Sequence, residues 1–104
     1  MSAKIFTNGF ALIIMLSIAR LNKASLMAIK AEIERCTDKK IKPGAISASL
    51  KLLENRQFVS RVLEQQEGEK TRGQRDRVYI YRLNEAGRKD LKWLLNAIDL
   101  LRSV

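Results

Sequence analysis

The sequence contains no histidine and a single cysteine, Cys36, among its 104 residues. Without imidazole, histidine-based zinc sites, Ser-His-Asp triads and Cys-His pairs are all excluded. One cysteine forms neither an intrachain disulfide nor a cysteine-based metal site, and a lone thiol fits a reducing cytoplasm. The sequence also lacks a phosphate-binding loop and a carboxylate cluster. We therefore expect a cytoplasmic protein without cofactor or metal, and not an enzyme.

Long apolar runs are also scarce. The one candidate, residues 9–19, is too short to span a bilayer and ends in Arg20 rather than at a small-residue cleavage site. It is therefore interpreted as a buried core helix and not as a signal peptide. Because this helix is apolar nearly all round, it should be buried on more than one side, which favours a partner subunit.

Basic residues, in contrast, are abundant. Twenty Lys and Arg stand against 11 Asp and Glu, for a net charge of +9. Residues 38–82 hold eleven basic and six acidic side chains, whereas residues 84–104 hold four and three. Such an excess favours a polyanionic partner, nucleic acid first and an anionic membrane surface second. The alternative is a basic protein that is merely soluble, because charge alone does not determine a fold.

The spacing of apolar residues predicts helices over about 8–21, 25–36, 43–57 and 85–102, and strands over about 58–63 and 78–83. Asn8 and Ser25 are expected to cap the first two helices, and Pro43 suits the first turn of the third. Three helices, a hairpin and a last helix make a mainly α winged helix-turn-helix. We expect a DNA-binding domain over 1–83 and a C-terminal dimerisation helix over 84–104.

The third helix (43–56) is the candidate reader of a major groove. Gly44 and Ala48 have small side chains, so a nucleic-acid backbone can approach the exposed face of this helix closely. Ser47 and neighbouring polar side chains can hydrogen-bond to bases or phosphates. The alternative for each residue is a solvated helix surface. In and before this helix, the predicted DNA contacts are Lys39, Lys40, Lys42, Gly44, Ser47, Ala48, Lys51 and Asn55.

The segment 67–77 between the two strands is the predicted wing. It contains four basic residues beside a glycine-containing turn, interrupted by acidic ones, and such side chains can reach phosphates or a minor groove. An ordinary exposed hairpin loop is the alternative interpretation. The predicted wing contacts are Lys70, Arg72, Arg75 and Arg77.

The last helix has a wider apolar stripe than one small domain requires, which favours a homodimer over packing within the monomer alone. Together with the apolar first helix, it gives a predicted dimer interface of Phe10, Ile14, Leu91, Leu94, Leu95, Ile98 and Leu101.

Two segments resemble the PadR-like winged-helix transcriptional regulators: KPGAISASLKLLENRQFV (42–59) and VYIYRLNEAGRKDL (78–91). The chain departs from the family pattern at Ser47, where a tyrosine is usual, at Gln57, where a glycine is usual, and at Lys23-Ala24-Ser25, which replaces a His-Gly-Tyr-like helix opening. Asn84 takes the place of a capping threonine.

The resemblance implies a homodimeric DNA-binding regulator, commonly a repressor, whose final helix packs on the partner's N-terminal helix. Some relatives bind small aromatic effectors at the dimer interface, which makes Trp93 a candidate effector contact, with a plain packing tryptophan as the alternative. The alternative function is a winged-helix protein-interaction module in a conjugation, replication or transcription complex.

Overall fold

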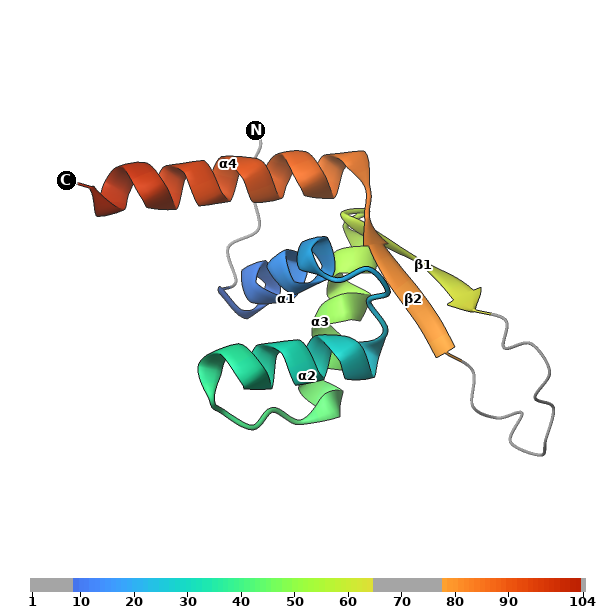
Figure 1. Cartoon of the computed structure of the whole chain (residues 1–104). Helices are drawn as coiled ribbons and strands as arrows, with labels where there is room; N and C mark the ends of the chain where they lie inside the picture. Colours follow the sequence, from blue (N-terminus) through green and yellow to red (C-terminus); the bar gives the residue numbers. More distant parts are fainter. Residues whose placement is uncertain (1–8, 65–77, 104) are drawn as a thin grey trace, which may run out of the picture.

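The computed structural model describes residues 9–64 and 78–103. In chain order, the described part consists of α1 (Gly9–Arg20), α2 (Leu26–Thr37), α3 (Pro43–Asn55), β1 (Val59–Glu64), β2 (Val78–Leu83) and α4 (Glu85–Arg102) (Figure 1). The predicted order of helices and strands is confirmed, as is the mainly α class with one β-hairpin. The third helix ends two residues earlier than expected, at Asn55.

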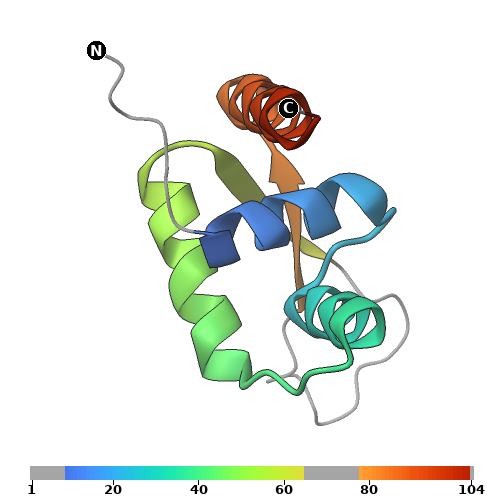
Figure 2. The same ribbon diagram turned by 90° about the vertical axis from the view of Figure 1, so that its left-hand side faces the viewer.

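The helices enclose one core, with α1 at its centre. Figures 1 and 2 show α1 between α4 on one side and α2 on the other, with α3 running along its flank. The largest fully buried side chains come from all three of the first helices: Ile14, Met15, Ile29, Ile46, Leu50 and Leu53. Their removal from water is the main favourable contribution to the fold.

The start of α2 and the start of α3 have the local chemistry that the sequence predicts. Ser25 caps α2, because its hydroxyl oxygen accepts a hydrogen bond from the Ala28 amide at 3.1 Å. Pro43 occupies the first turn of α3, where it has no amide hydrogen to lose from the helix.

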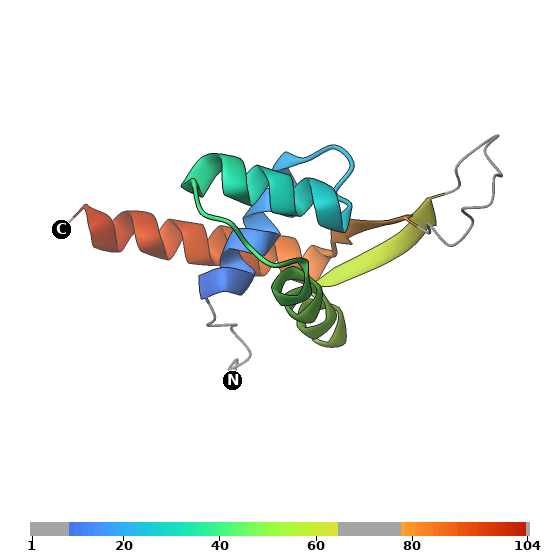
Figure 3. The same cartoon turned by 90° about the horizontal axis from the view of Figure 1, so that it is seen from below.

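The hairpin is antiparallel, with Val59 opposite Leu83 at its base and Glu64 opposite Val78 at its last described pair. A single bridge adds the α1–α2 connection to this sheet: the Tyr81 amide donates to the Ala24 carbonyl at 3.0 Å. Figure 3 shows the hairpin and the far end of α4 pointing in opposite directions. The sheet is therefore attached to the helical core at its base and extends away from it.

Asn84 precedes α4, as predicted, but its side chain does not cap that helix. The prediction of a threonine-like cap is wrong, because the Asn84 side-chain amide is used elsewhere. Its Nδ2 donates to the Gln57 carbonyl at 2.8 Å, and its backbone amide donates to the Phe58 carbonyl at 2.9 Å. Gln57 itself has φ 64°, the left-handed conformation that glycine adopts most readily. Asn84 thus joins the beginning of α4 to the α3–β1 turn.

The first half of α4 shares the common core, since Leu91 is 6% exposed. Its C-terminal half continues past the N-terminal end of α1 (Figure 1). No helix in the described part of the chain has both the length and the apolar character needed to cross a membrane.

Candidate nucleic-acid interface

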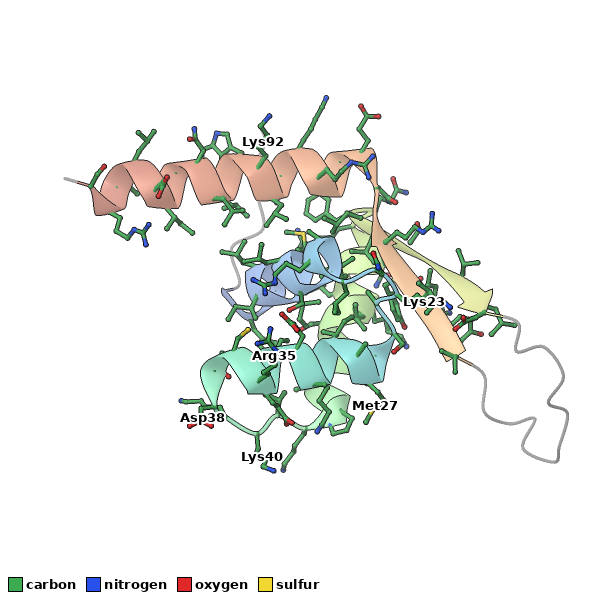
Figure 4. The ribbon with its side chains drawn as sticks, viewed as in Figure 1. Lys23, Met27, Arg35, Asp38, Lys40 and Lys92 are labelled. Atoms are coloured by element: carbon green, nitrogen blue, oxygen red, sulfur yellow. The ribbon has the colours of Figure 1, made fainter. Side chains whose placement is uncertain are left out.

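The connection between α2 and α3 presents three exposed lysines. It begins at Asp38, whose left-handed φ of 60° turns the chain and whose amide donates to the Glu34 carbonyl at 2.8 Å. The Lys39 amide then donates to the Thr37 hydroxyl at 3.3 Å. Figure 4 shows Lys40 pointing away from the body of the protein at this connection. Backbone bonds thus hold the segment in place while Lys39, Lys40 and Lys42 remain exposed.

Glu34 is the residue that fixes this connection to α2. Its carboxylate accepts the Ile41 amide at 2.7 Å and pairs with the Lys30 ammonium at 3.1 Å. The Ile41 hydrogen bond and then the Lys30 charge hold the pKa of Glu34 below its usual 4.5. This role of Glu34 was not predicted from the sequence. The sequence does contain a sign of it: Glu34 is an acidic residue in the last turn of a helix. The helix dipole disfavours a negative charge there unless another interaction compensates.

Another acidic group joins α1 to α2 behind this connection. The Glu32 carboxylate lies 2.9 Å from Arg35 and 3.2 Å from Arg20, which belongs to α1. The Arg35 hydrogen bond is the largest cause that lowers the pKa of Glu32, and the same contact raises the pKa of Arg35. Both arginines are exposed, so these pairs orient α2 more than they stabilise the fold.

The outer face of α3 carries the predicted recognition residues, and all of them are exposed: Gly44, Ser47, Ala48, Lys51 and Asn55. The opposite side of the helix is buried through Ile46, Leu50 and Leu53. A Cβ built on Gly44 would meet nothing within 4 Å, so the packing of the chain itself does not require glycine there. No side chain caps α3, whose N-cap is Lys42. Pro43 has no amide hydrogen and the Ala45 amide donates to the Lys42 carbonyl at 3.0 Å, so the Gly44 amide between them is the candidate donor to an external acceptor such as a phosphate oxygen.

Two ion pairs hold the hairpin to the helical part of the protein. Lys23, in the α1–α2 connection, lies 2.8 Å from Glu64, and Arg61 of β1 lies 3.2 Å from Glu54 of α3. The Arg61 guanidinium also stacks on the Tyr79 ring, 4.2 Å from its centroid. These contacts fix how β1 and β2 leave α3. The predicted wing contacts Lys70, Arg72, Arg75 and Arg77 lie outside the described residues.

The residues of the predicted dimer interface fall into three groups by their exposure. Ile14 and Leu91 are buried in the core of the single chain, which leaves their side chains no surface to offer a partner. Phe10 and Leu94 are half-buried against the core, whereas Leu95, Ile98 and Leu101 are exposed. We call Leu94, Leu95, Ile98 and Leu101 the inner stripe of α4. An interface at this stripe stays a prediction.

A groove of about 590 Å³ runs between the end of α1, β2 and the first half of α4. Its walls include Ile18, Leu83 and Leu91, and the basic side chains of Arg82 and Arg88 border it. Trp93 is not among its walls and lies instead in a shallow pocket with Lys89, Lys92 and Asn96. The effector contact proposed for Trp93 therefore does not involve this groove, and it stays a prediction. In the described part of the chain, no group of three acidic or cysteine side chains gathers as metal ligands.

Three packed helices, a helix-turn-helix formed by α2 and α3, and an antiparallel hairpin define a winged helix-turn-helix protein. No family model and no curated protein matches the sequence. Solved structures do match. The PadR-like transcription factor of Bacteroides fragilis has a TM-score of 0.75 at 17% identity, over 91% of this chain and 84% of that one.

A PadR-family regulator of Clostridium difficile has a TM-score of 0.70 at 19% identity, over 91% of this chain and 93% of that one. Bacillus subtilis PadR, solved in complex with operator DNA, has a TM-score of 0.65 at 20% identity, over 84% of this chain. The match covers 48% of that protein, about half its length. The fold is that of the PadR-like transcriptional regulators, so the resemblance seen in the sequence is confirmed for the fold. Both of the first two neighbours are transcription regulators.

Proposed function

We propose that this chain is a DNA-binding transcriptional regulator that works as a homodimer in the cytoplasm, and that it acts as a repressor. Residues 1–83 would bind DNA and the helix within 84–104 would bring two copies together. In this proposal the N-terminal half of α3 enters a major groove, and the 67–77 segment contacts the backbone.

The single observation that carries the proposal is the shape of the outer α3 face. Gly44 and Ala48 are exposed and small, and the space beside Gly44 is open. Glycine costs about 0.5–1 kcal/mol relative to alanine inside a helix. Its presence there, without any need from the chain's own packing, is explained if another molecule approaches the backbone closely. The exposed lysines of the α2–α3 connection give that approach a positive charge, which suits phosphate.

The proposal is tested by selecting bound duplexes from a random DNA pool at two salt concentrations. A homodimeric regulator should enrich inverted repeats, since two copies related by a twofold axis read two half-sites. Affinity should also fall steeply with salt, because each neutralised phosphate releases counterions. A monomer with weak, sequence-blind binding would instead indicate a winged-helix protein-interaction module.

Single substitutions test the residue assignments. Lys51→Ala and Arg75→Ala should each weaken DNA binding without changing the thermal unfolding of the protein. If Lys51 contacts a base, its loss should weaken the binding free energy by about 1–3 kcal/mol and relax specificity at that base position. If it contacts a phosphate, the slope of log affinity against log salt concentration should fall by about 1. Lys89→Ala, an exposed lysine of α4, is the matched control and should bind as the wild type does. Unchanged binding in both test variants would refute the assignments.

The homodimer is tested separately from DNA binding. The exposed inner-stripe residue Ile98 is the natural target, because a charge there opposes apolar association but disturbs little of the monomer core. Ile98→Lys should convert the dimer to monomer in sedimentation experiments, and it should also lower the affinity for an inverted repeat. Retention of the dimer would place the interface elsewhere.

A further inference from the structure

A second apolar stripe runs along α4, on the side that faces away from the core. Ala86, Trp93 and Leu100 recur at intervals of seven residues. Two helical turns separate each from the next, so all three lie on one side of the helix. At 100° per residue, Trp93 and Leu100 lie about 180–200° from Leu91, whose side chain is buried in the core. We call these three residues the outer stripe.

The outer stripe is exposed. Trp93 is 56% accessible and Leu100 is 63% accessible. Within the described residues, α4 packs against α1 and β2, which lie on its other side. Figure 4 shows Lys92, beside the stripe, pointing away from the rest of the protein. Scattered exposed leucines are ordinary, but a tryptophan and a leucine in heptad register form the kind of seam through which helices pair.

We propose that the outer stripe binds α4 of a second copy of this chain, with the two α4 helices packed antiparallel. A twofold axis between Asn96 and Ala97 relates residue 93 of one helix to residue 100 of the other. Trp93 of each copy then lies against the partner's Leu100. The stripe is thus complementary to itself, as the isologous contact between two identical subunits requires.

The charges beside the stripe are also complementary under the same axis. Lys92 and Asp99 lie on one flank of α4, seven residues apart, and both are exposed. Antiparallel pairing brings Lys92 close to the partner's Asp99. The two residues are not directly opposite but are offset by about two residues, or ~3 Å along the helix axis. Asp99 lies 3.0 Å from Arg102 of its own chain in an exposed pair, which can rearrange at little cost.

The overall charge of the protein favours this face for self-association. Residues 84–104 hold four basic and three acidic side chains, whereas residues 38–82 hold eleven and six. Two copies therefore repel each other least when they meet through α4. A second candidate occupant is an acidic segment of another protein, attracted by Lys89 and Lys92. That occupant explains Trp93 and the lysines but not Leu100 or Asp99, so we favour a second copy.

This contact is additional to the inner-stripe dimer in the proposed function. The two stripes lie on different sides of α4, so one helix can take part in both contacts. Two dimers joined through their outer stripes make a tetramer with two DNA-binding units, which would bind two neighbouring operators cooperatively. If the inner-stripe dimer does not form, the outer stripe still joins two monomers. The two proposals therefore fail separately.

Sedimentation velocity over a wide range of protein concentration tests the proposal. As the concentration rises, the wild type should form a larger species through the outer stripe: one larger than the inner-stripe dimer, or a dimer that survives Ile98→Lys if the inner-stripe dimer does not form. Trp93→Lys and Leu100→Lys should each lower the association constant of that species by at least about tenfold. Both should leave the Ile98-dependent dimer and the thermal unfolding unchanged, because neither side chain belongs to the core. Absence of the larger species in the wild type, or its persistence in both variants, would overturn the proposal.

Charge reversal gives a sharper test of the antiparallel geometry. Lys92→Asp and Asp99→Lys should each weaken the larger species, because each variant places like charges opposite one another. The double variant restores opposite charges and should recover most of the wild-type association. A double variant weaker than both single ones would overturn the antiparallel pairing. Outer-stripe variants that change only the capture of an acidic protein, with self-association intact, would overturn it in favour of the acidic partner.

Discussion

Gly87, in the first turn of α4, lies so close to the backbone of Phe58 that a Cβ there would overlap the Phe58 carbonyl oxygen. The same oxygen accepts the Asn84 amide at 2.9 Å. The beginning of α4 and the α3–β1 turn are therefore in direct backbone contact. This contact determines the direction in which α4 leaves the hairpin.

We predict that Gly87→Ala destabilises the protein by about 1–3 kcal/mol, since inserting a methyl group against a packed backbone forces either neighbour to shift. Unfolding in urea, followed by circular dichroism, measures the effect. Gly44→Ala is the matched control, because a Cβ at Gly44 meets nothing within 4 Å. Equal free energies of unfolding for the two variants would contradict the overlap at Phe58.

Gln57 offers the opposite prediction, a stabilising change. Its φ of 64° costs a non-glycine residue about 1–2 kcal/mol. Glycine avoids this cost but loses about 0.5–1 kcal/mol through its greater conformational entropy in the unfolded chain. Gln57→Gly should therefore stabilise the protein by up to about 1 kcal/mol. Gln57→Ala keeps the Cβ and should give no such gain. Thermal unfolding of both variants distinguishes relief of the backbone from loss of the glutamine side chain.

Gly44→Ala should separate stability from binding. Alanine in the first turn of α3 should leave the free energy of unfolding unchanged or raise it by up to about 1 kcal/mol. DNA affinity should nevertheless fall by about tenfold or more, because the added methyl group obstructs the close approach of the nucleic acid. Gly9→Ala, at the start of α1, is the control, since its Cβ also meets nothing within 4 Å. A Gly44→Ala protein that binds DNA as tightly as Gly9→Ala would rule out a close approach at this position.

The Glu34 carboxylate predicts a pH-dependent contribution to stability. Its folded pKa lies below the usual 4.5, so the contribution is fully present above about pH 4.5 and is lost as pH falls through the lower folded value. Glu34→Gln should be less stable than the wild type at neutral pH, and the difference should shrink in acid. Denaturant midpoints measured across this range check the prediction.

Glu85→Gln is the control for Glu34, because it removes an equal charge from an exposed residue in the first turn of α4. At neutral pH, Glu85→Gln should lower the free energy of unfolding by less than Glu34→Gln does, since Glu85 gains only the interaction with the helix dipole. DNA binding gives an independent measurement: Glu34→Gln should weaken it by loosening the segment that carries Lys39 and Lys40, whereas Glu85→Gln should not. A Glu34→Gln deficit that stays constant from neutral pH to acid would contradict the ionic role of the carboxylate.

Much of the fold follows from local patterns in the sequence. Ile46, Leu50 and Leu53 recur at spacings that place them on one face of a helix, which predicts a buried face, and all three are buried. Ser25 and Pro43 have side chains whose chemistry belongs at the start of a helix, and both are found there. These predictions succeed because neighbours in the sequence decide them.

The contacts that sequence reasoning missed join residues far apart in the chain. Asn84 was expected to cap α4, but a carbonyl 27 residues earlier, that of Gln57, takes its side-chain amide. Local pattern cannot choose between the two partners, the amides at the start of α4 and the distant carbonyl, because only the packed turn brings the carbonyl near. The Tyr81–Ala24 bridge and the Lys23–Glu64 pair are missed for the same reason. In the candidate site, exposure of the α3 face followed from helical spacing, whereas the hydrogen bond from Ile41 to Glu34 did not.

Lys40 and Lys92 lie at opposite extremes of the protein in Figure 4, one beside α3 and the other on α4. The basic excess is concentrated over residues 38–82, and the segment containing α4 is nearly neutral. Such an arrangement gives the protein an electrical asymmetry from one side to the other. Near a polyanion, we expect the protein to rotate so that the α2–α3 connection faces the polyanion before any atoms touch. Added salt should then slow the encounter chiefly by removing this orientation, whereas the residence time depends on the contacts that α3 makes afterwards.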